Sequence, residues 1–368
     1  MQILEKHVLK SYLASFVFCI TMLIVVGVIG DIFSIIEDIF KHNISLGSIF
    51  GFYFYLGPFA FVNMLPFACL LAAVYVFNSL SKHHEITAVI ASGISLWKLL
   101  KPVMAATFIL CVITFIVSDK IVPPTLEKAN TIKRDELEAY KVYDTEGPAI
   151  RDLAVYADGG QIIFAQYFYT DKNILKNLII DRQDDDNIIT EKVSAREVMW
   201  VPGGNSGGYW EGTDVMVFQL EPSGAFRGDP AVFKKKIVRI SETPEVLRTA
   251  RSEPALMSYA QLQAHIGRMH SGFKDTVRRL EVDLYYKLAF PFMAMVTVLI
   301  GVPFSIETGR GNALVGMAKG IAAGVAYLPF VAVSLALGKG GYIRPEIAPW
   351  LAMAIFCLAG IYLVNRKS

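Results

Sequence analysis

Cysteines and charged residues are scarce in this 368-residue sequence, and their scarcity excludes several classes of protein. Charged residues make up 18% of the chain and apolar residues 54%, a composition that argues against a water-soluble globule and for a membrane protein. The four cysteines all lie within apolar runs, so neither a disulfide framework nor a zinc site is indicated. They are Cys19, Cys69, Cys111 and Cys357.

The sequence also lacks the motifs of a nucleotide-hydrolysing or metal-dependent enzyme. It contains no GxxxxGKS or GxxxxGKT motif, so it cannot cradle nucleotide phosphates in the Walker manner. His83, His84 and Glu85 are adjacent but no HExxH motif follows, and Asp184–Asp186 is better explained as a solvated turn than as a calcium site. No catalytic serine, histidine and acid set stands out. We therefore expect no catalytic residue, no metal, no cofactor and no nucleic-acid partner for this chain.

Long charge-poor runs predict six membrane-spanning helices, because most of the runs reach the roughly 20 residues that cross a hydrocarbon core. They occupy about 11–36, 47–81, 102–118, 288–306, 313–337 and 347–364. The first run is too long for a signal peptide and is interpreted as a retained anchor. The second is longer than one crossing requires and is expected to tilt, protrude or bend near Gly57-Pro58 and Pro66.

Basic residues gather on one side of these six spans. That side comprises both chain ends and the loops 81–101 and 307–319, and the excess of lysine and arginine predicts that it is cytoplasmic. The residues are Lys6, Lys10, Lys82, Lys98, Lys101, Arg310, Lys319, Arg366 and Lys367. The long segment between the third and fourth spans then lies on the opposite side of the membrane.

That long segment reads as a β domain inserted into a helical membrane protein. From about residue 150, short runs rich in β-branched and aromatic residues alternate with Gly, Asp, Asn and Pro, which favours an antiparallel sandwich or an incomplete jelly roll. The stretch 258–285 predicts a helix that returns the chain to the membrane. The expected domains are 1–122 with the first three spans, 123–280 with the β domain, and 281–368 with the last three spans.

A short helix is predicted at about 83–97, between the second and third spans. Its apolar residues recur at spacings of three and four and share one face. They are Ile86, Val89, Ile90, Ile94 and Trp97. The other face carries polar and small residues, chiefly Glu85, Ala88, Ser92 and Ser95. The residues alone leave two interpretations open: an ordinary interfacial loop helix, or a coupling helix that docks on a cytosolic ATPase through Glu85 and its small neighbours.

Three stretches of the sequence resemble the LptF/LptG family of lipopolysaccharide export permeases: HEITAVIASGIS, the outer IVPP, and EVDLYYKLAFPFMAMVTVLIGVPFS. The resemblance covers essentially the whole chain, and the start MQILEKHVLKSYL favours the LptG-type subunit. It implies a multi-pass protein of the bacterial inner membrane with a jelly-roll-like domain in the periplasm. The function implied is extraction of lipopolysaccharide from the outer leaflet and its transfer to a periplasmic bridge during outer-membrane biogenesis.

The resemblance also implies partners and coupling residues. The partners are a second six-span permease, a dimeric LptB-like cytosolic ATPase that uses ATP and Mg, and single-span LptC-like regulator and LptA-like bridge proteins. The coupling-helix acid of the family corresponds to Glu85. Residues expected to couple to the ATPase are Glu85, Ile86, Val89, Ile90 and Gly93.

Three residues are candidates for handling the lipid. Asp31 either lines a cavity or pairs with a basic group, or else the first helix ends early and Asp31 is already at the headgroup level. Lys41 lies just beyond the first span, where the family implies a cation that meets lipid phosphates. Lys287, at the outer start of the fourth run, either binds the lipid or extends its ammonium to the interface.

Gly316, Gly320 and Gly324 are four residues apart and align on one face of the fifth run. Such a stripe permits close helix contact. Tight static packing is one interpretation. The other, implied by the resemblance, is a lateral gate between the first and fifth spans of opposite subunits.

Two other classes of function were weighed. A non-transporting membrane scaffold or sensor, with a ligand-binding β domain outside, is the main alternative. An intramembrane enzyme is disfavoured because no paired catalytic groups occur within the predicted spans.

Overall fold

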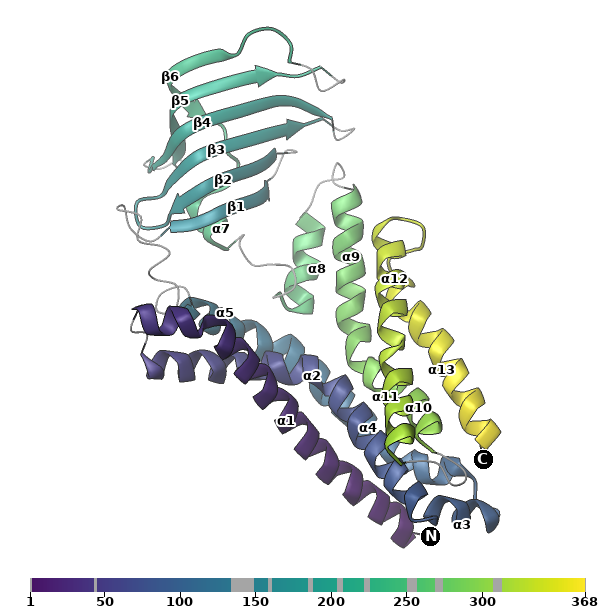
Figure 1. Cartoon of the computed structure of the whole chain (residues 1–368). Helices are drawn as coiled ribbons and strands as arrows, with labels where there is room; N and C mark the ends of the chain where they lie inside the picture. Colours follow the sequence, from purple (N-terminus) through teal and green to yellow (C-terminus); the bar gives the residue numbers. More distant parts are fainter. Residues whose placement is uncertain are drawn as a thin grey trace. The chain divides into compact units, whose positions relative to one another are not determined.

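The chain folds into two compact units, each described here by itself (Figure 1). The computed structural model describes residues 2–42, 45–133, 149–157, 161–184, 188–203, 208–221, 226–249, 257–268, 274–306 and 313–367. The helical unit comprises Met1–Lys133, Ser258–Ala260 and Arg278–Ser368. The β unit comprises Arg134–Met257 and Gln261–Val277.

Six helical segments in the described residues are long and apolar enough to cross a membrane, which confirms the predicted number of spans. The first two are α1 (Gln2–His42) and α2 (Leu46–Lys82). The third consists of α4 (Leu96–Ile116), a π-helical turn η1 (Val117–Ile121) and α5 (Val122–Ile132). The π turn directly precedes the two consecutive prolines of α5, whose missing amide protons interrupt the regular ladder. The short helix α3 (Glu85–Ala91) connects α2 to α4.

The second half of the helical unit holds three further spans. The fourth consists of α9 (Lys274–Ala289), a 3-10 turn η4 (Phe290–Phe292) and α10 (Met293–Ser305). The fifth is formed by α11 (Ala313–Val325) and α12 (Tyr327–Lys339), and the sixth is α13 (Ala348–Lys367).

The helix that carries the fourth span begins well before the apolar run predicted from about 288. It is described from Val277 to Ser305, and its charged residues, of which Lys287 is the last, all precede that run. Pro291 lies within the one-turn η4, where a missing amide proton is tolerated, so the helix continues through it. The returning helix predicted at 258–285 corresponds to two described helices, α8 (Tyr259–Arg268) and α9, and α9 leads directly into the span.

The core of the helical unit joins its two halves. One buried cluster takes side chains from α1, α2, α3, α4, α10 and α13, including Tyr12, Phe77, Ile86, Leu100, Val298 and Val364. Within it the Tyr12 hydroxyl lies 2.8 Å from that of Thr107, which itself donates to a backbone carbonyl. The N-terminus, α3 and the C-terminus lie at the same end of this unit (Figure 1). That end is called the α3 end below.

The β unit contains a six-stranded antiparallel sheet in which every strand pairs with its neighbours in sequence (Figure 1). The strands are β1 (Ala149–Ala157), β2 (Gln161–Tyr169), β3 (Ile174–Gln183), β4 (Ile189–Val201), β5 (Tyr209–Gln219) and β6 (Ala231–Val238). The predicted inserted β domain is confirmed. Its described strands form a single meander, whereas the sequence favoured a sandwich or an incomplete jelly roll.

One face of this sheet forms the core of the β unit. Its buried side chains include Ile163, Phe168, Leu178, Ile180, Val198 and Val215. The short helix α7 (Pro244–Thr249) adds Leu247, which is fully buried in the same cluster. The indole N–H of Trp210 donates to the backbone carbonyl of Glu242 at 2.9 Å, fixing the segment that leads into α7. The segment 242–249 therefore covers part of the apolar face.

The four strands β2 to β5 change phase at the same level, along a transverse line across the sheet. Buried positions should recur every two residues in a strand, yet β3 buries Leu175 and then Leu178, and β4 buries Ala195 and then Val198. In each of the five strand pairings, one pair of facing residues at this level does not take part in the regular backbone pairing. The residues at this level are Asp152, Gln166, Asn177, Arg196, Asp214 and Lys234.

Two residues on the transverse line adopt left-handed backbone conformations that residues other than glycine seldom adopt. Asn177 has φ 49° and Asp214 has φ 51°. Asn and Asp tolerate this region best, which explains the side chains found here. Because β2 to β5 shift at the same level, the register between these strands is kept while their set of inward-facing residues moves by one position. On the outer face, Asn177 Nδ2 donates to Gln166 Oε1 at 2.6 Å.

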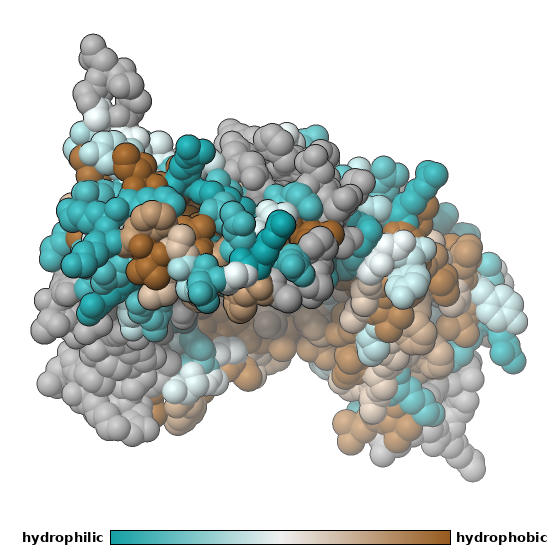
Figure 2. Space-filling model, turned by 90° about the horizontal axis from the view of Figure 1, so that it is seen from above, coloured by the Kyte–Doolittle hydropathy of each residue, from teal (hydrophilic) through white to brown (hydrophobic). Residues whose placement is uncertain are grey.

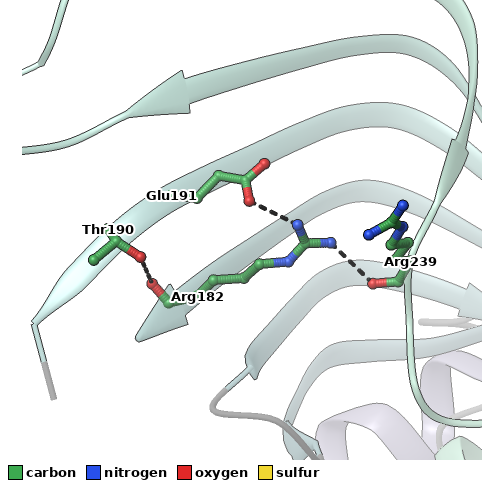
Figure 3. Close-up of polar contacts among 4 residues, drawn as sticks. All are labelled: Arg182, Thr190, Glu191 and Arg239. Carbon is green, nitrogen blue, oxygen red and sulfur yellow. Dashed lines mark hydrogen bonds and ion pairs between the residues drawn. The ribbon is translucent and has the colours of Figure 1, made fainter. Parts of the chain in front are cut away.

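Arg182 ties together the ends of three chain segments (Figure 3). Its guanidinium contacts Glu191 Oε2 of β4 at 2.7 Å and donates to the carbonyl of Arg239, just after β6, at 3.2 Å. The side chains of Arg182 and Glu191 are 24% and 29% exposed, so this pair is less screened than a surface pair. Elsewhere the visible surface of the β unit is mainly hydrophilic with scattered hydrophobic side chains (Figure 2).

Candidate functional site

Helix α3 is a short helix held at both ends by backbone geometry. It begins after His84, whose φ of 59° turns the chain out of α2. At its other end the amide of Gly93 donates to the carbonyl of Ile90, and the amide of Ile94 donates to that of Val89. This is a Schellman ending, and the φ of 75° at Gly93 suits glycine alone. Gly93 therefore sets the turn after α3.

The apolar face of α3 packs against the chain's own core. Ile86 is 2% exposed, and Val89 and Ile90 are partly buried against the same cluster. Three of the five residues predicted to couple to an ATPase thus anchor α3 to the helical unit.

The opposite face of α3 is open to solvent. Its exposed residues are Glu85, Thr87, Ala88, Ala91, Ser92 and Gly93. The Ser92 hydroxyl donates to the carbonyl of Val89 at 2.7 Å, which keeps the side chain folded against the helix. The exposed face is consequently low and smooth, with the carboxylate of Glu85 at its start.

The α3 end carries three further contacts that the sequence analysis did not identify. The indole N–H of Trp97 donates to Oδ1 of Asn365 at 2.5 Å. The ammonium of Lys367 donates to the carbonyls of Pro303 at 2.6 Å and Ile306 at 2.8 Å. Asn365 gave no sequence signal, and Lys367 counted only as one of several basic residues.

Asp31 has a defined partner, a tyrosine hydroxyl. Tyr53 of α2 donates to Asp31 Oδ2 at 2.7 Å. The suggestion that the first helix ends early at Asp31 is wrong, because α1 continues to His42. Lys41 belongs to α1, but its side chain lies outside the part of the chain that the structure describes.

Lys287 lies in the last turn of α9, directly before the apolar run predicted from about 288, within the helix that carries the fourth span. The acids whose charges act on its ammonium are Asp119 and Asp283. Asp283 also pairs with Lys339 at 2.6 Å, and Asp119 accepts the backbone N–H of Tyr259 at 2.7 Å. Lys287 therefore belongs to a polar group that joins the third, fourth and fifth spans.

The glycine stripe of the fifth span faces the chain's own helices. A Cβ on Gly320 would lie 2.9 Å from the carbonyl oxygen of Gly301 in α10, and one on Gly324 would lie 2.5 Å from a methyl of Leu70 in α2. Gly316, Gly320 and Gly324 are all buried. Within this chain the stripe therefore packs against α10 and α2, in agreement with the packing interpretation, and the lateral gate stays a prediction.

Two spans bury less of their length within the chain than the others do. Buried residues make up 11% of the apolar 18-residue window in the first span and 28% in the fifth, against 33% in the third and sixth, 56% in the second and 72% in the fourth. The exposed side chains of these spans are large and apolar, among them Phe18, Val26, Phe33, Leu314, Phe330 and Val333. Both spans present apolar surface that lipid or another helix could cover.

Among the residues that the structure describes, no group of three or more His, Cys, Asp and Glu side chains is placed to hold a metal ion.

A family model described as "Lipopolysaccharide export system permease LptF/LptG" matches residues 6–366 of this chain. The match covers both subunit types and does not distinguish the LptG type from the LptF type. No curated protein matches the chain.

Proposed function

The chain belongs to the LptF/LptG family of lipopolysaccharide export permeases, and from this premise we propose that it is one permease half of an ATP-driven lipid extractor in the bacterial inner membrane. The observation that carries the mechanism is α3, a short helix anchored on its apolar face and open on its polar one. A separate ATPase displaces this helix, and the membrane spans convert the displacement into movement of lipid.

The ATPase-contacting surface is the open face of α3. Glu85 offers a charge to a basic residue of a dimeric cytosolic ATPase, which binds ATP and Mg. Small neighbours such as Ala88 and Ala91 let the partner approach closely. Ile86, Val89 and Ile90 hold the helix in place, so a displacement of α3 moves the helical core with it. This assignment puts the α3 end and both termini in the cytoplasm, in agreement with the basic residues there.

The lipid chamber lies between this chain and a second six-span permease. The sparse burial of the first and fifth spans supports this, because both leave large apolar side chains for a partner and for acyl chains. Moving one acyl chain of about a dozen methylenes into water costs roughly 10 kcal/mol, so escape without ATP is negligible. Lys41, at the far end of α1 from the α3 end, contacts lipid phosphates, while Asp31 is held by Tyr53 at the same rim.

The β unit lies in the periplasm and receives the acyl chains. Its inner face is apolar, and the segment that carries Leu247 covers part of that face. Displacement of this segment opens the face to the lipid. Single-span regulator and bridge proteins continue the same apolar path.

The test reverses the charge of Glu85. The Glu85→Lys chain is assembled with the second permease and the ATPase in proteoliposomes that contain lipopolysaccharide. We expect loss of ATPase association and of lipid release. The matched control is Glu127→Lys on α5, an exposed residue outside α3. If Glu85→Lys associates and releases lipid as the parent chain does, the coupling role of α3 is wrong. If the parent chain binds no ATPase and no second permease, a scaffold or sensor replaces the transporter.

A further inference from the structure

Three helix ends are tied together at the α3 end of the helical unit. The helix α4 starts at Leu96, capped by Ser95, whose hydroxyl accepts the amide N–H of Trp97 at 3.3 Å. In that first turn the indole of Trp97 reaches Asn365 near the end of α13. Two residues further on, Lys367 reaches the last carbonyls of α10. Three elements distant in sequence therefore meet through side-chain hydrogen bonds next to α3.

Lys367 acts as the cap of a helix in another part of the chain. The last carbonyls of a helix lack intrahelical donors and carry partial negative charge, so a cation stabilises them. Ile306, the C-cap of α10, is 3% exposed and lies in the core cluster, so a buried helix end gains its donor from α13. The end of α13 is in turn anchored by Val364, fully buried in the same cluster as Ile86.

We propose that Trp97, Asn365 and Lys367 form a coupling relay that carries a displacement of α3 to α10 and, through the close Gly301–Gly320 contact, to the fifth span. The inference rests on the proposed function, in which α3 receives the ATPase. The three residues are positioning residues, since they act through helix ends and not on the lipid. The relay explains how a push on the first half of the chain reaches the second half, although α3 is joined covalently only to α2 and α4.

The turn between α3 and α4 is suited to transmit such a displacement. It is only a few residues long, and its backbone is fixed by the Schellman ending at Gly93 and the Ser95 cap. A tilt of α3 therefore moves the first turn of α4 and the Trp97 indole with it. Beyond α10, Gly301 and Gly320 leave no room for independent movement, because a Cβ on either would lie within 3.2 Å of the other's carbonyl oxygen.

The experiment measures lipid released per ATP hydrolysed in proteoliposomes of the complete transporter. Trp97→Phe keeps the aromatic body and removes the N–H donor, and Lys367→Met keeps the aliphatic stem and removes the ammonium. We expect Trp97→Phe, which loses one hydrogen bond, to lower the ratio about fivefold, and Lys367→Met, which loses two, to lower it at least as much. ATPase association should be retained in both. Arg366→Met is the matched control, because it removes the neighbouring charge of the same helix turn and should leave the ratio unchanged.

Conservative variants separate a relay from a merely structural role. Asn365→Asp retains an acceptor for the indole and Lys367→Arg retains a cationic donor, so both should keep the parent ratio. Trp97→Phe combined with Asn365→Ala should be no worse than either alone, because both remove one bond. An unchanged ratio in Trp97→Phe and Lys367→Met overturns the relay, as does an equal fall with Arg366→Met. Failure of Glu85→Lys to weaken ATPase association would instead refute the proposed function.

Discussion

The hydroxyl of Tyr53 on α2 donates a 2.7 Å hydrogen bond to the Oδ2 atom of Asp31 on α1. An ionisable group in a span is costly unless a partner satisfies it. The bond joins two neighbouring helices near the end of the helical unit that lies away from α3, and it gives Asp31 a structural role independent of any lipid.

Removing this hydroxyl should destabilise the chain. We expect Tyr53→Phe to lower the free energy of unfolding in detergent by about 1 kcal/mol, the usual net value of a hydrogen bond. Asp31→Asn keeps an acceptor oxygen and should cost less. Tyr55→Phe is the control. It removes a hydroxyl from the same helix but keeps the aromatic ring, whose centroid lies 5.4 Å from the ammonium of Lys128. Equal unfolding free energies for Tyr53→Phe and Tyr55→Phe would contradict the role of the bond.

The packing of the glycine stripe predicts a site-specific effect of one added methyl group. Gly320→Ala would bring its Cβ within 2.9 Å of a backbone oxygen that cannot move aside, so we expect a loss of roughly 1–3 kcal/mol of unfolding free energy. Gly27→Ala in α1 is the control, since no atom lies within 4 Å of its added Cβ. That change should be neutral or stabilising by up to about 1 kcal/mol, because alanine favours the helix. A neutral Gly320→Ala would mean that α10 and α11 do not pack as described.

The left-handed backbone at Asp214, on the transverse line of the sheet, predicts that valine destabilises the β unit at this position and glycine does not. Valine is strained at a φ of 51°, so Asp214→Val should cost about 1–3 kcal/mol. Asp214→Gly should stay close to the parent chain, because the exposed 3.9 Å pair with Arg196 contributes little, roughly 0–1 kcal/mol. Hydrogen exchange of the β5 amides in the full chain measures both. Thr213→Val, at the adjacent regular position, should not accelerate exchange, and similar exchange in all three variants would refute the strain.

The spans were predictable because a helix that crosses the lipid needs a continuous run of apolar residues, and such a run is visible in the sequence itself. The fourth apolar run was predicted from about 288, and the structure adds that its helix begins earlier, in the charged helix α9. Asp283 of α9 pairs with Lys339 across helices, so that charge is satisfied within the unit. Such pairing depends on residues far apart in sequence.

For the candidate site too, the sequence predicted local features and not the contacts between distant residues. The periodicity of Ile86, Val89, Ile90, Ile94 and Trp97 predicted one helix over about 83–97. The structure confirms the apolar face for Ile86, Val89 and Ile90. The predicted length is wrong, because α3 ends at Ala91, the chain turns at Gly93, and Trp97 belongs to α4. The periodicity could not indicate whether that face meets a partner or the chain's own core, because both surfaces are apolar. The contacts of Asn365 and Lys367 could not be predicted, because single polar residues near a chain end form no recognisable sequence pattern.

Composition and periodicity alone determined that this is a six-span membrane protein with an inserted β domain, because hydrophobic length and two-residue alternation follow from local solvation. The sequence motifs also pointed to the family that the whole-chain match supports. Only the tertiary structure decided which faces are occupied: the glycine stripe by α2 and α10, the apolar face of α3 by the core, and the end of α10 by Lys367. The physical reason is that a residue's chemistry limits the kinds of group it can contact, whereas its actual partner depends on which segments fold beside it.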